Sequence, residues 1–383
     1  MAIDNKDKKI LNVPHLRFPE FSGEWEMVSL QDIATINPKS DPLQNTFIYI
    51  DLEAVEKGEL RKIQEIMREE APSRAQRVID NNDILFQCVR PYQKNNYIHR
   101  ILNTSNQQWV ASTGYAQIRT TELPNYIYHL LNTDEFNRKV MVRCTGSSYP
   151  AINSEDLATI HFYYTPDKKE QLKISRLLDL LDKRIATQNK IIEDLKKLKS
   201  AISLKLLHSD SWEQFRIKDI ASIGRGRVIS SIEISQQENP LYPVYSSQTS
   251  NDGIMGYLDD FMFEGEYISW TTDGANAGTV FYRNGKFNCT NVCGLLKLKK
   301  GFDAHFVSLV LAEATKRYVS TNLANPKLMN NTMGDIQICL PQLEDQKRIS
   351  VVFRKLQGLL ETHNTLIVKY SKQKQYLLSQ MFI

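Results

Sequence analysis

The chain contains one pattern twice, and this repeat constrains the fold more than any other feature of the sequence. Residues 25–36 recur as residues 212–223, with the same Trp, Glu, Asp, Ile, Ala and Ile at matching places. Residues 145–160 align without gaps to residues 321–336. A period this long excludes a solenoid of short units and predicts two copies of one module, related by an approximate two-fold.

Each copy of the module is followed by a segment with the pattern of a long helix. Between Pro166 and about Leu207 there is no glycine and no further proline, and apolar residues recur at alternating steps of three and four. This spacing predicts an amphipathic helix of roughly forty residues, about 60 Å long. The apolar stripe of such a helix needs a partner to cover it.

The second copy supplies that partner, because adding 175 to each apolar position of the first segment gives another apolar residue. Even the polar interruptions of the stripe, Gln188 and Lys199, map to polar residues, His363 and Lys374. The two helices are therefore expected to pack on each other, antiparallel. The expected packing residues are Ile174, Leu178, Leu181, Ile185, Ile192 and Leu195 in the first helix, and Phe353, Leu356, Leu360, Ile367, Tyr370 and Leu377 in the second.

The rest of the chain mixes short β-rich runs with turn residues, which predicts an α+β fold. The expected organisation is a first domain over residues 1–165, a helix over 166–208, a second domain over 209–340 and a second helix over 341–383. The two domains diverge most in their loops. A shared frame with divergent loops is typical of two readers of different ligands.

Composition adds few constraints. A net charge of +4 permits a polyanionic partner without requiring one. The five cysteines form no paired framework and no zinc set, which favours reduced thiols. The charged residues 4–9 do not resemble a signal peptide, and no apolar stretch is long enough to cross a membrane. A cytoplasmic location is expected.

The sequence offers no self-sufficient active site and no cofactor site. The glycine-rich segment before Lys286 has the wrong spacing for a phosphate-binding loop, and Phe287 replaces the required Ser or Thr. The carboxylates of a nuclease-like pattern, Asp167 and Asp194, fall about 40 Å apart on one helix and cannot share a metal. The chain is therefore expected not to be an enzyme.

Nucleic-acid binding is the function that the loops favour. Cationic side chains suit phosphates, whereas Arg, Asn and Gln suit base edges in the major groove. In the first domain a solvated basic face is the alternative. The candidate DNA-binding residues of the first domain are Arg74, Arg77, Gln87, Arg90, Tyr92, Gln93 and Lys94, with Ser147, Ser148 and Tyr149 of the repeated loop.

The second domain has hydroxyl and amide side chains beside glycine turns, for which ordinary turn formation is the alternative. Its copy of the repeated loop, residues 321–326, lacks the glycine and both serines of the first copy. The candidates in the second domain are Arg225, Arg227, Ser246, Ser247, Gln248, Thr271, Thr272, Asn276 and Lys327.

Taken together, the chain resembles the DNA-specificity subunit of type I restriction-modification systems. Three features carry the resemblance: the opening residues 14–21 with Trp25 and Glu26, both Asp-Ile-Ala segments, and both helix starts with Pro, Glu/Asp-Gln and Ile-Ser. The resemblance implies a non-catalytic bacterial subunit that binds double-stranded DNA. It also implies two target-recognition domains, each reading one half of a bipartite site.

The resemblance further implies two adenine methyltransferase subunits docked on this chain, with restriction subunits joining through them. S-adenosylmethionine, ATP and Mg²⁺ would belong to those partners, and no cofactor to this chain. Paired rigid helices would fix the spacing of the two readers, so two short blocks around an unread gap are expected, near one helical turn of DNA apart. The alternative is a non-catalytic scaffold with two protein-binding domains, which would show no salt-dependent affinity for DNA.

Overall fold

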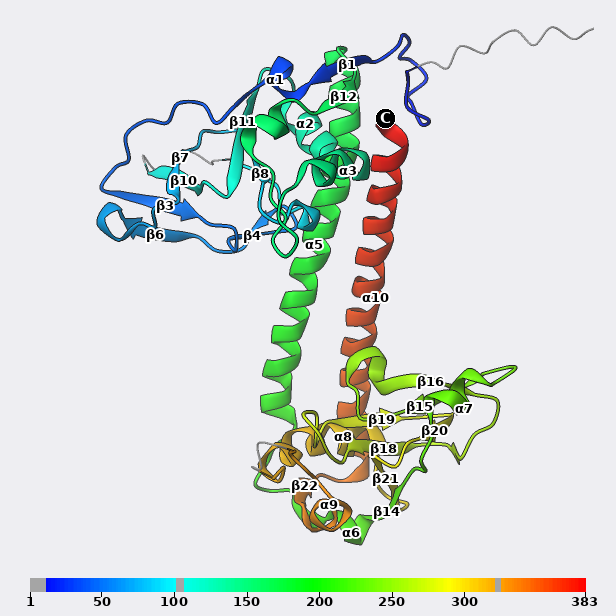
Figure 1. Cartoon of the computed structure of the whole chain (residues 1–383). Helices are drawn as coiled ribbons and strands as arrows, with labels where there is room; N and C mark the ends of the chain where they lie inside the picture. The colour runs from blue at the N-terminus through cyan, green and yellow to red at the C-terminus, as the bar shows by residue number, and fades with distance from the viewer. Residues whose placement is uncertain (1–11, 101–106, 321–324) are drawn as a thin grey trace, which may run out of the picture. The chain divides into compact units, whose positions relative to one another are not determined.

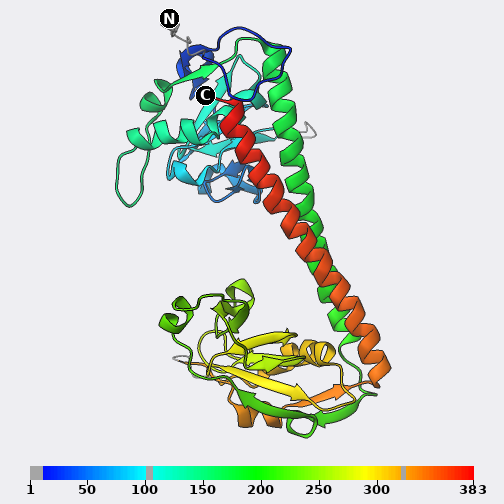
Figure 2. The same cartoon turned by 90° about the vertical axis from the view of Figure 1, so that its right-hand side faces the viewer.

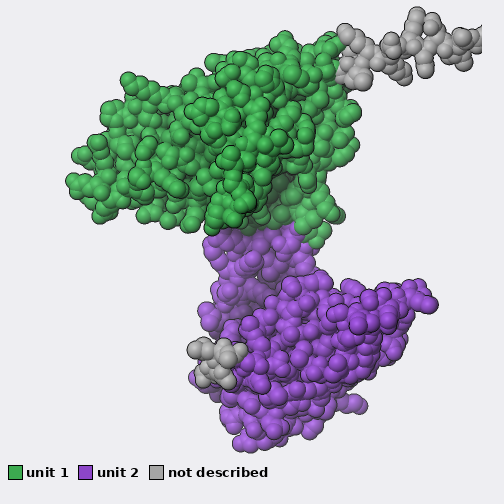
Figure 3. Space-filling view, viewed as in Figure 1, with its two compact units in different colours: residues 1–189, 365–383 green, residues 190–364 purple. Residues whose placement is uncertain are grey.

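The chain divides into two compact units. The computed structural model describes residues 12–100, 107–320 and 325–383. Unit 1 consists of residues 1–189 and 365–383, and unit 2 of residues 190–364 (Figure 3). Each unit takes one half of each long helix, whereas the expected boundaries gave each helix a segment of its own. The charged residues 4–9 and residues 321–324 of the repeated loop lie outside the described residues.

Unit 1 is built on two four-stranded sheets and two short ribbons (Figure 1). One sheet has the order β2 (Ala34–Ile36), β11 (Tyr115–Thr120), β8 (Ile84–Gln87), β9 (Tyr97–Ile98), and the other β6 (Gln64–Met67), β3 (Thr46–Ile50), β10 (Gln108–Ser112), β7 (Ala75–Val78). The ribbons pair β1 (Glu26–Ser29) with β12 (His161–Tyr164) and β4 (Val55–Glu56) with β5 (Glu59–Leu60). All paired strands are antiparallel except β3 and β10.

Short helices complete unit 1 and bury its main core. They are α1 (Leu30–Ile33), α2 (Pro124–Leu131), α3 (Asp134–Arg143) and α4 (Ser154–Ala158), with the 3-10 turns η1 (Arg68–Glu70) and η2 (Pro91–Gln93). Trp25, at the start of the repeat, is buried, and its ring meets that of Tyr126 on α2 edge-on, with centroids 6.4 Å apart. The repeated tryptophan is thus a core residue of its unit.

Unit 2 has two four-stranded sheets in the same strand order and one ribbon, without a counterpart of the β4–β5 ribbon among its described residues. A parallel pair of strands falls at the equivalent place, between β15 and β20. The strands are β14 (Ala221–Arg225), β21 (Cys293–Leu298), β18 (Tyr267–Thr271) and β19 (Val280–Arg283), then β16 (Ile254–Leu258), β15 (Tyr242–Tyr245), β20 (Lys286–Cys289) and β17 (Phe263–Glu264), and the ribbon β13 (Glu213–Arg216) with β22 (Gln337–Leu340). Its helices are α6 (Ile217–Ile220), α7 (Ser231–Ser235), α8 (Ala304–Ala314) and α9 (Asn330–Asp335), with η3 (Ser250–Gly253) and η4 (Thr315–Arg317). The predicted α+β fold with an internal repeat is confirmed, because the repeat extends to strand order and direction.

The two long helices are α5 (Lys168–Leu206) and α10 (Leu343–Met381), and a repeated glutamine fixes where each begins. Gln171 donates to the carbonyl of Thr165 at 2.8 Å and accepts from the backbone N–H of Leu123, which caps α2, at 3.3 Å. Gln346 donates to the carbonyl of Pro341 at 2.8 Å and accepts from the N–H of the α8 cap at 2.9 Å. The Glu/Asp-Gln motif of the sequence therefore joins each long helix to the short helix of its own unit.

Within unit 1 the beginning of α5 lies alongside the end of α10 (Figures 1 and 2). Leu178 and Leu377 belong to one buried cluster. At the polar interruption of the stripe, Lys374 Nζ lies 2.5 Å from Asp182 Oδ1. The apolar stripe of α5 is thus covered in this unit by α10.

Unit 2 contains the matching contact between the end of α5 and the beginning of α10. Ile202 packs against the cluster that holds Phe353, and Lys199 Nζ donates to Gln357 Oε1 at 3.1 Å. The two lysines are 175 residues apart (374 − 199), and so are their partners (357 − 182). The two polar contacts are copies of one arrangement, and they make the helices antiparallel.

A matched pair of leucines on α5 tests this packing. Leu178 is 0% exposed, whereas Leu180 is 57% exposed. Leu178→Ala removes buried methyl groups and leaves a cavity, so we expect a loss of about 2–5 kcal/mol in the free energy of unfolding. Leu180→Ala should stay within about 0.5 kcal/mol of the wild type. Urea unfolding of both variants checks this, and equal losses would contradict the assigned stripe.

A buried histidine in unit 1 predicts how stability depends on pH. His99 is 1% exposed, and burial lowers its pKa to about 4. In the unfolded chain the pKa of a histidine is about 6.5, so on acidification the unfolded state takes up the proton first. The contribution of neutral His99 to the free energy of unfolding is complete above about pH 7. It should decline by about 1 kcal/mol between about pH 7 and about pH 5.5.

The control for that prediction is His99→Gln, compared with the wild type by urea unfolding at both pH values. The variant lacks the titrating group, so its loss between the two pH values should be smaller than that of the wild type. An equal loss would show that His99 does not carry the effect.

Candidate nucleic-acid interface

In unit 1 two segments far apart in the sequence meet beyond the end of β8. The backbone N–H of Arg90 donates to the carbonyl of Pro150 at 2.7 Å, and Val89 forms a β-bridge with Ala151. Arg90 has a φ of 54°, in the left-handed region that costs a non-glycine residue energy. Its guanidinium carbon lies 4.2 Å from the centroid of the Tyr149 ring. The structure thus brings together two predicted site residues from separate loops.

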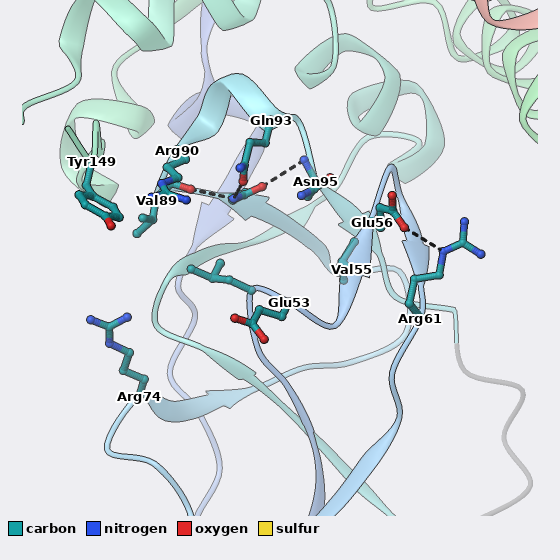
Figure 4. A pocket seen from close by; sticks show the side chains of 12 residues that line it. Glu53, Val55, Glu56, Arg61, Arg74, Val89, Arg90, Gln93, Asn95 and Tyr149 are labelled. Atoms are coloured by element: carbon teal, nitrogen blue, oxygen red, sulfur yellow. Dashed lines mark hydrogen bonds and ion pairs between the residues drawn. The ribbon is translucent and has the colours of Figure 1, made fainter. Parts of the chain in front are cut away.

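This meeting point borders a hollow of about 780 Å³ (Figure 4). Five of the predicted DNA-binding residues line it, namely Arg74, Gln87, Arg90, Gln93 and Tyr149. Figure 4 shows Arg74, Arg90 and Tyr149 on one side of the hollow and Arg61 on the other. A volume of this size lies in the range of ligand-binding clefts.

Two guanidinium groups that line the hollow, those of Arg74 and Arg90, form no ion pair within the described residues. The side chain of Arg74 is exposed and makes no hydrogen bond or ion pair with any residue in the described ranges. Arg90 Nε is buried and, among the described residues, has no hydrogen-bond partner. Tyr149 is 65% exposed and its ring lies against the Arg90 guanidinium, so a flat, partly cationic surface faces solvent. Such a surface suits phosphates and bases.

Other candidates of unit 1 serve the fold itself. Gln87 is 3% exposed; its amide donates to Val89 O at 2.8 Å and to Gln93 Oε1 at 2.9 Å, and its oxygen accepts from Asn95 N–H at 3.2 Å. Lys94 Nζ lies 2.6 Å from Asp134 Oδ1. These polar atoms already have partners, so Gln87 and Lys94 position the loop.

The remaining candidates of unit 1 differ in their exposure. Arg77 is half-buried; burial lowers its pKa, and its Nε has no partner among the described residues. Tyr92 on η2 and the serines Ser147 and Ser148 are exposed. Tyr92 and the two serines are therefore accessible to a ligand, and Arg77 only in part.

Unit 2 repeats the convergence at the equivalent strand, β18. The segment after β18 meets the second copy of the repeated loop through a β-bridge between Asp273 and Lys327. The N–H of Gly274 donates to the carbonyl of Pro326 at 3.0 Å, and that of Leu328 to the carbonyl of Thr272 at 2.8 Å. The same two parts of the module thus meet in both units, although their sequences differ.

The candidates of unit 2 are more occupied by internal contacts. Thr271 and Thr272 are buried, Arg227 is paired with Glu233, and Arg225 Nε donates to Asn330 Oδ1 at 2.9 Å. The half-buried Ser246, Ser247 and Gln248 form one turn; Asn276 Nδ2 donates to Ser247 O at 3.3 Å, and Gln248 Nε2 to Ile254 O at 2.5 Å. The side chain of Lys327 is exposed. Of the cationic candidates in unit 2, Lys327 is exposed without an ion pair among the described residues, whereas the exposed Arg227 is paired with Glu233.

The most buried arginine of this region, Arg283, was not predicted from the sequence. Arg283 is buried; its guanidinium carbon lies 3.6 Å from the Tyr245 ring centroid, and its Nη1 lies 2.8 Å from Asp252 Oδ2. Asn251 and Asp252 of the turn that it holds both have positive φ values, 49° and 53°. Nothing in a strand residue beside an Asn-Gly turn marks it as buried, so only the packing identifies Arg283.

Over the ranges that the structure describes, no group of three or more His, Cys, Asp or Glu side chains could hold a metal ion. No helix there is long and apolar enough to cross a membrane. Cys289 and Cys293, the nearest two cysteines, are buried as free thiols.

Comparison with known proteins identifies the family. The family model for the type I restriction modification DNA specificity domain matches residues 22–197 and again residues 209–369. A putative type I specificity subunit of Mycoplasma pneumoniae is 37% identical over 225 residues, which cover 57% of this chain and 93% of that protein. The specificity subunit of the type I restriction enzyme MpnII, from the same organism, is 41% identical over 177 residues, or 45% of this chain and 53% of that protein.

The fold has counterparts among solved structures. The crystal structure of the S subunit of a type I restriction-modification system from M. genitalium superposes with a TM-score of 0.69 at 16% identity, covering 97% of this chain and 99% of that one. A structure concerned with complex assembly of a type I system gives a TM-score of 0.56 at 19% identity and covers 93% of this chain and 97% of that one. Because the family model matches both repeats, the chain belongs to the type I restriction-modification specificity family, the non-catalytic DNA-recognition subunits of these systems, and carries two recognition modules.

Proposed function

We propose that this chain reads a bipartite site in double-stranded DNA, with one module for each half-site. The observation that carries the proposal is the same convergence in both units: the segment after β8 or β18 meets the repeated loop. A common frame places these segments, while their different side chains would select different bases. The gap between the half-sites would remain unread.

In unit 1 the proposed contacts divide by chemistry. Arg74 and Arg90 would bind phosphate or a guanine edge, and Tyr149 would offer its ring and hydroxyl. Ser147, Ser148 and Tyr92 would add short polar contacts. Gln87 and Lys94 would act indirectly, since their polar atoms hold the loop.

The partners belong to the proposal too. Two adenine methyltransferase subunits would dock on this chain, and restriction subunits would join through them. S-adenosylmethionine, ATP and Mg²⁺ would be bound by those subunits. The relation between the two contacts Lys199–Gln357 and Lys374–Asp182 supports two docking sites, because a repeated helix pair offers two similar surfaces.

A pair of exposed arginines in unit 1 tests the DNA contacts. In the complex with its methyltransferase partner, Arg74→Ala should weaken binding to a target duplex and reduce the slope of log K against log salt by about 0.9 for each lost phosphate contact. Arg138→Ala removes an equal charge on α3, from a side chain paired with Glu135 at 2.8 Å, and should change neither quantity. Affinity measured between about 50 and 200 mM salt gives both numbers.

If Arg74→Ala behaves like Arg138→Ala, the hollow of unit 1 is not the DNA contact. If neither the wild type nor any variant shows salt-dependent DNA affinity, the scaffold alternative is favoured.

A further inference from the structure

The hollow of unit 1 is lined by two acidic side chains, and one of them, Glu53, has no cationic partner in the described ranges. Glu53 lines this hollow with Arg74 and Arg90, and Figure 4 shows it between the two sides. The carboxylate of Glu53 is exposed and has no hydrogen-bond or ion-pair partner in the described ranges. Glu56, the other acid in the lining, differs, because its Oε2 lies 3.6 Å from Arg61 Nε. Glu53 therefore has its acceptors free.

A fixed turn presents Glu53 to the hollow. The turn links β3 to β4, and the backbone N–H of Glu53 donates to Asp51 Oδ1 at 3.0 Å. The hydroxyl of Tyr115, which is buried, donates to the carbonyl of Asp51 at 3.2 Å. The backbone of Glu53 is thus held by the turn and by the sheet beneath it, and a base-reading side chain needs such a fixed backbone.

The chemistry of a free carboxylate restricts what it can recognise on DNA. It carries only acceptors, so it needs a donor. In the major groove the donors are the exocyclic amino groups, N4 of cytosine and N6 of adenine, and Glu is a known partner of cytosine N4. Guanine and thymine present acceptors at the matching place, which a carboxylate would repel.

The neighbouring cations agree with this assignment. Arginine recognises O6 and N7 of guanine, whose paired cytosine presents its N4 amino group on the same groove edge. The free guanidinium of Arg74 and the carboxylate of Glu53 border one hollow. Net charge alone does not explain this mixture, because a site that only held phosphate would be stronger without the acid.

We infer that Glu53 is a specificity-determining residue, which accepts a hydrogen bond from the exocyclic amino group of a cytosine or adenine in the half-site read by unit 1. The inference rests on the proposed function. It adds an acidic residue to a site whose candidates predicted from the sequence were cations, amides and hydroxyls.

The test is Glu53→Gln in the full chain, assembled with its methyltransferase partner. Methylation rates are measured on duplexes that carry each of the four base pairs at every position of the target. The amide offers a donor as well as an acceptor, so at one position of one block the preference for C or A should fall by about 5- to 150-fold. The base preferred by the wild type at that position distinguishes cytosine from adenine. The second block should keep its preferences.

The matched control is Glu69→Gln, which removes the same charge from exposed η1 outside the hollow. It should leave every preference unchanged, and thermal unfolding should show that both variants fold. Unchanged preferences in Glu53→Gln would overturn the inference. So would an equal gain or loss at all positions, since that would mean a general electrostatic effect. If the wild-type complex has no two-block preference, the proposed function itself fails.

Discussion

The packing of α5 on α10 is the constraint on which the rest of the structure depends. Neither helix can leave its apolar stripe in water, and residues of α5 and α10 share a buried cluster in each unit. The antiparallel pairing places Lys199 against Gln357 and Lys374 against Asp182, so even the polar interruptions have partners. Each unit consequently contains a half of both helices, and neither half of the chain forms its unit alone.

The repeated glutamines extend this constraint to the recognition modules. Gln171 and Gln346 are buried and join the start of a long helix to the cap of α2 or α8. Each module is thereby attached to its helix through buried hydrogen bonds, which are costly to leave unmade. This attachment leaves the loops beyond β8 and β18 free to vary without disturbing the frame.

The repeated features were predictable from the sequence, and the site was predictable only in part. The helix ends fall within a few residues of the expected ones, because proline and acidic residues mark the helix starts and the stripe has a clear period. Arg90 and Tyr149 were both predicted as candidates from the sequence. Their packing against each other is a tertiary contact, which only the structure shows. Gln87 has the residue type of a base reader, yet it is buried and fully bonded, which no local pattern reveals. Nothing in the sequence around Glu53 marks it as a base contact, because a single carboxylate in a turn has no local pattern that separates it from an ordinary solvent-exposed acid.

We propose that one chain with two modules specifies one bipartite target. The most direct measurement is single-molecule sequencing of adenine methylation in cells with and without this gene, with the methyltransferase partner expressed in both. The account predicts that deletion abolishes methylation at one motif made of two short blocks around an unread gap. An unchanged methylome would contradict it.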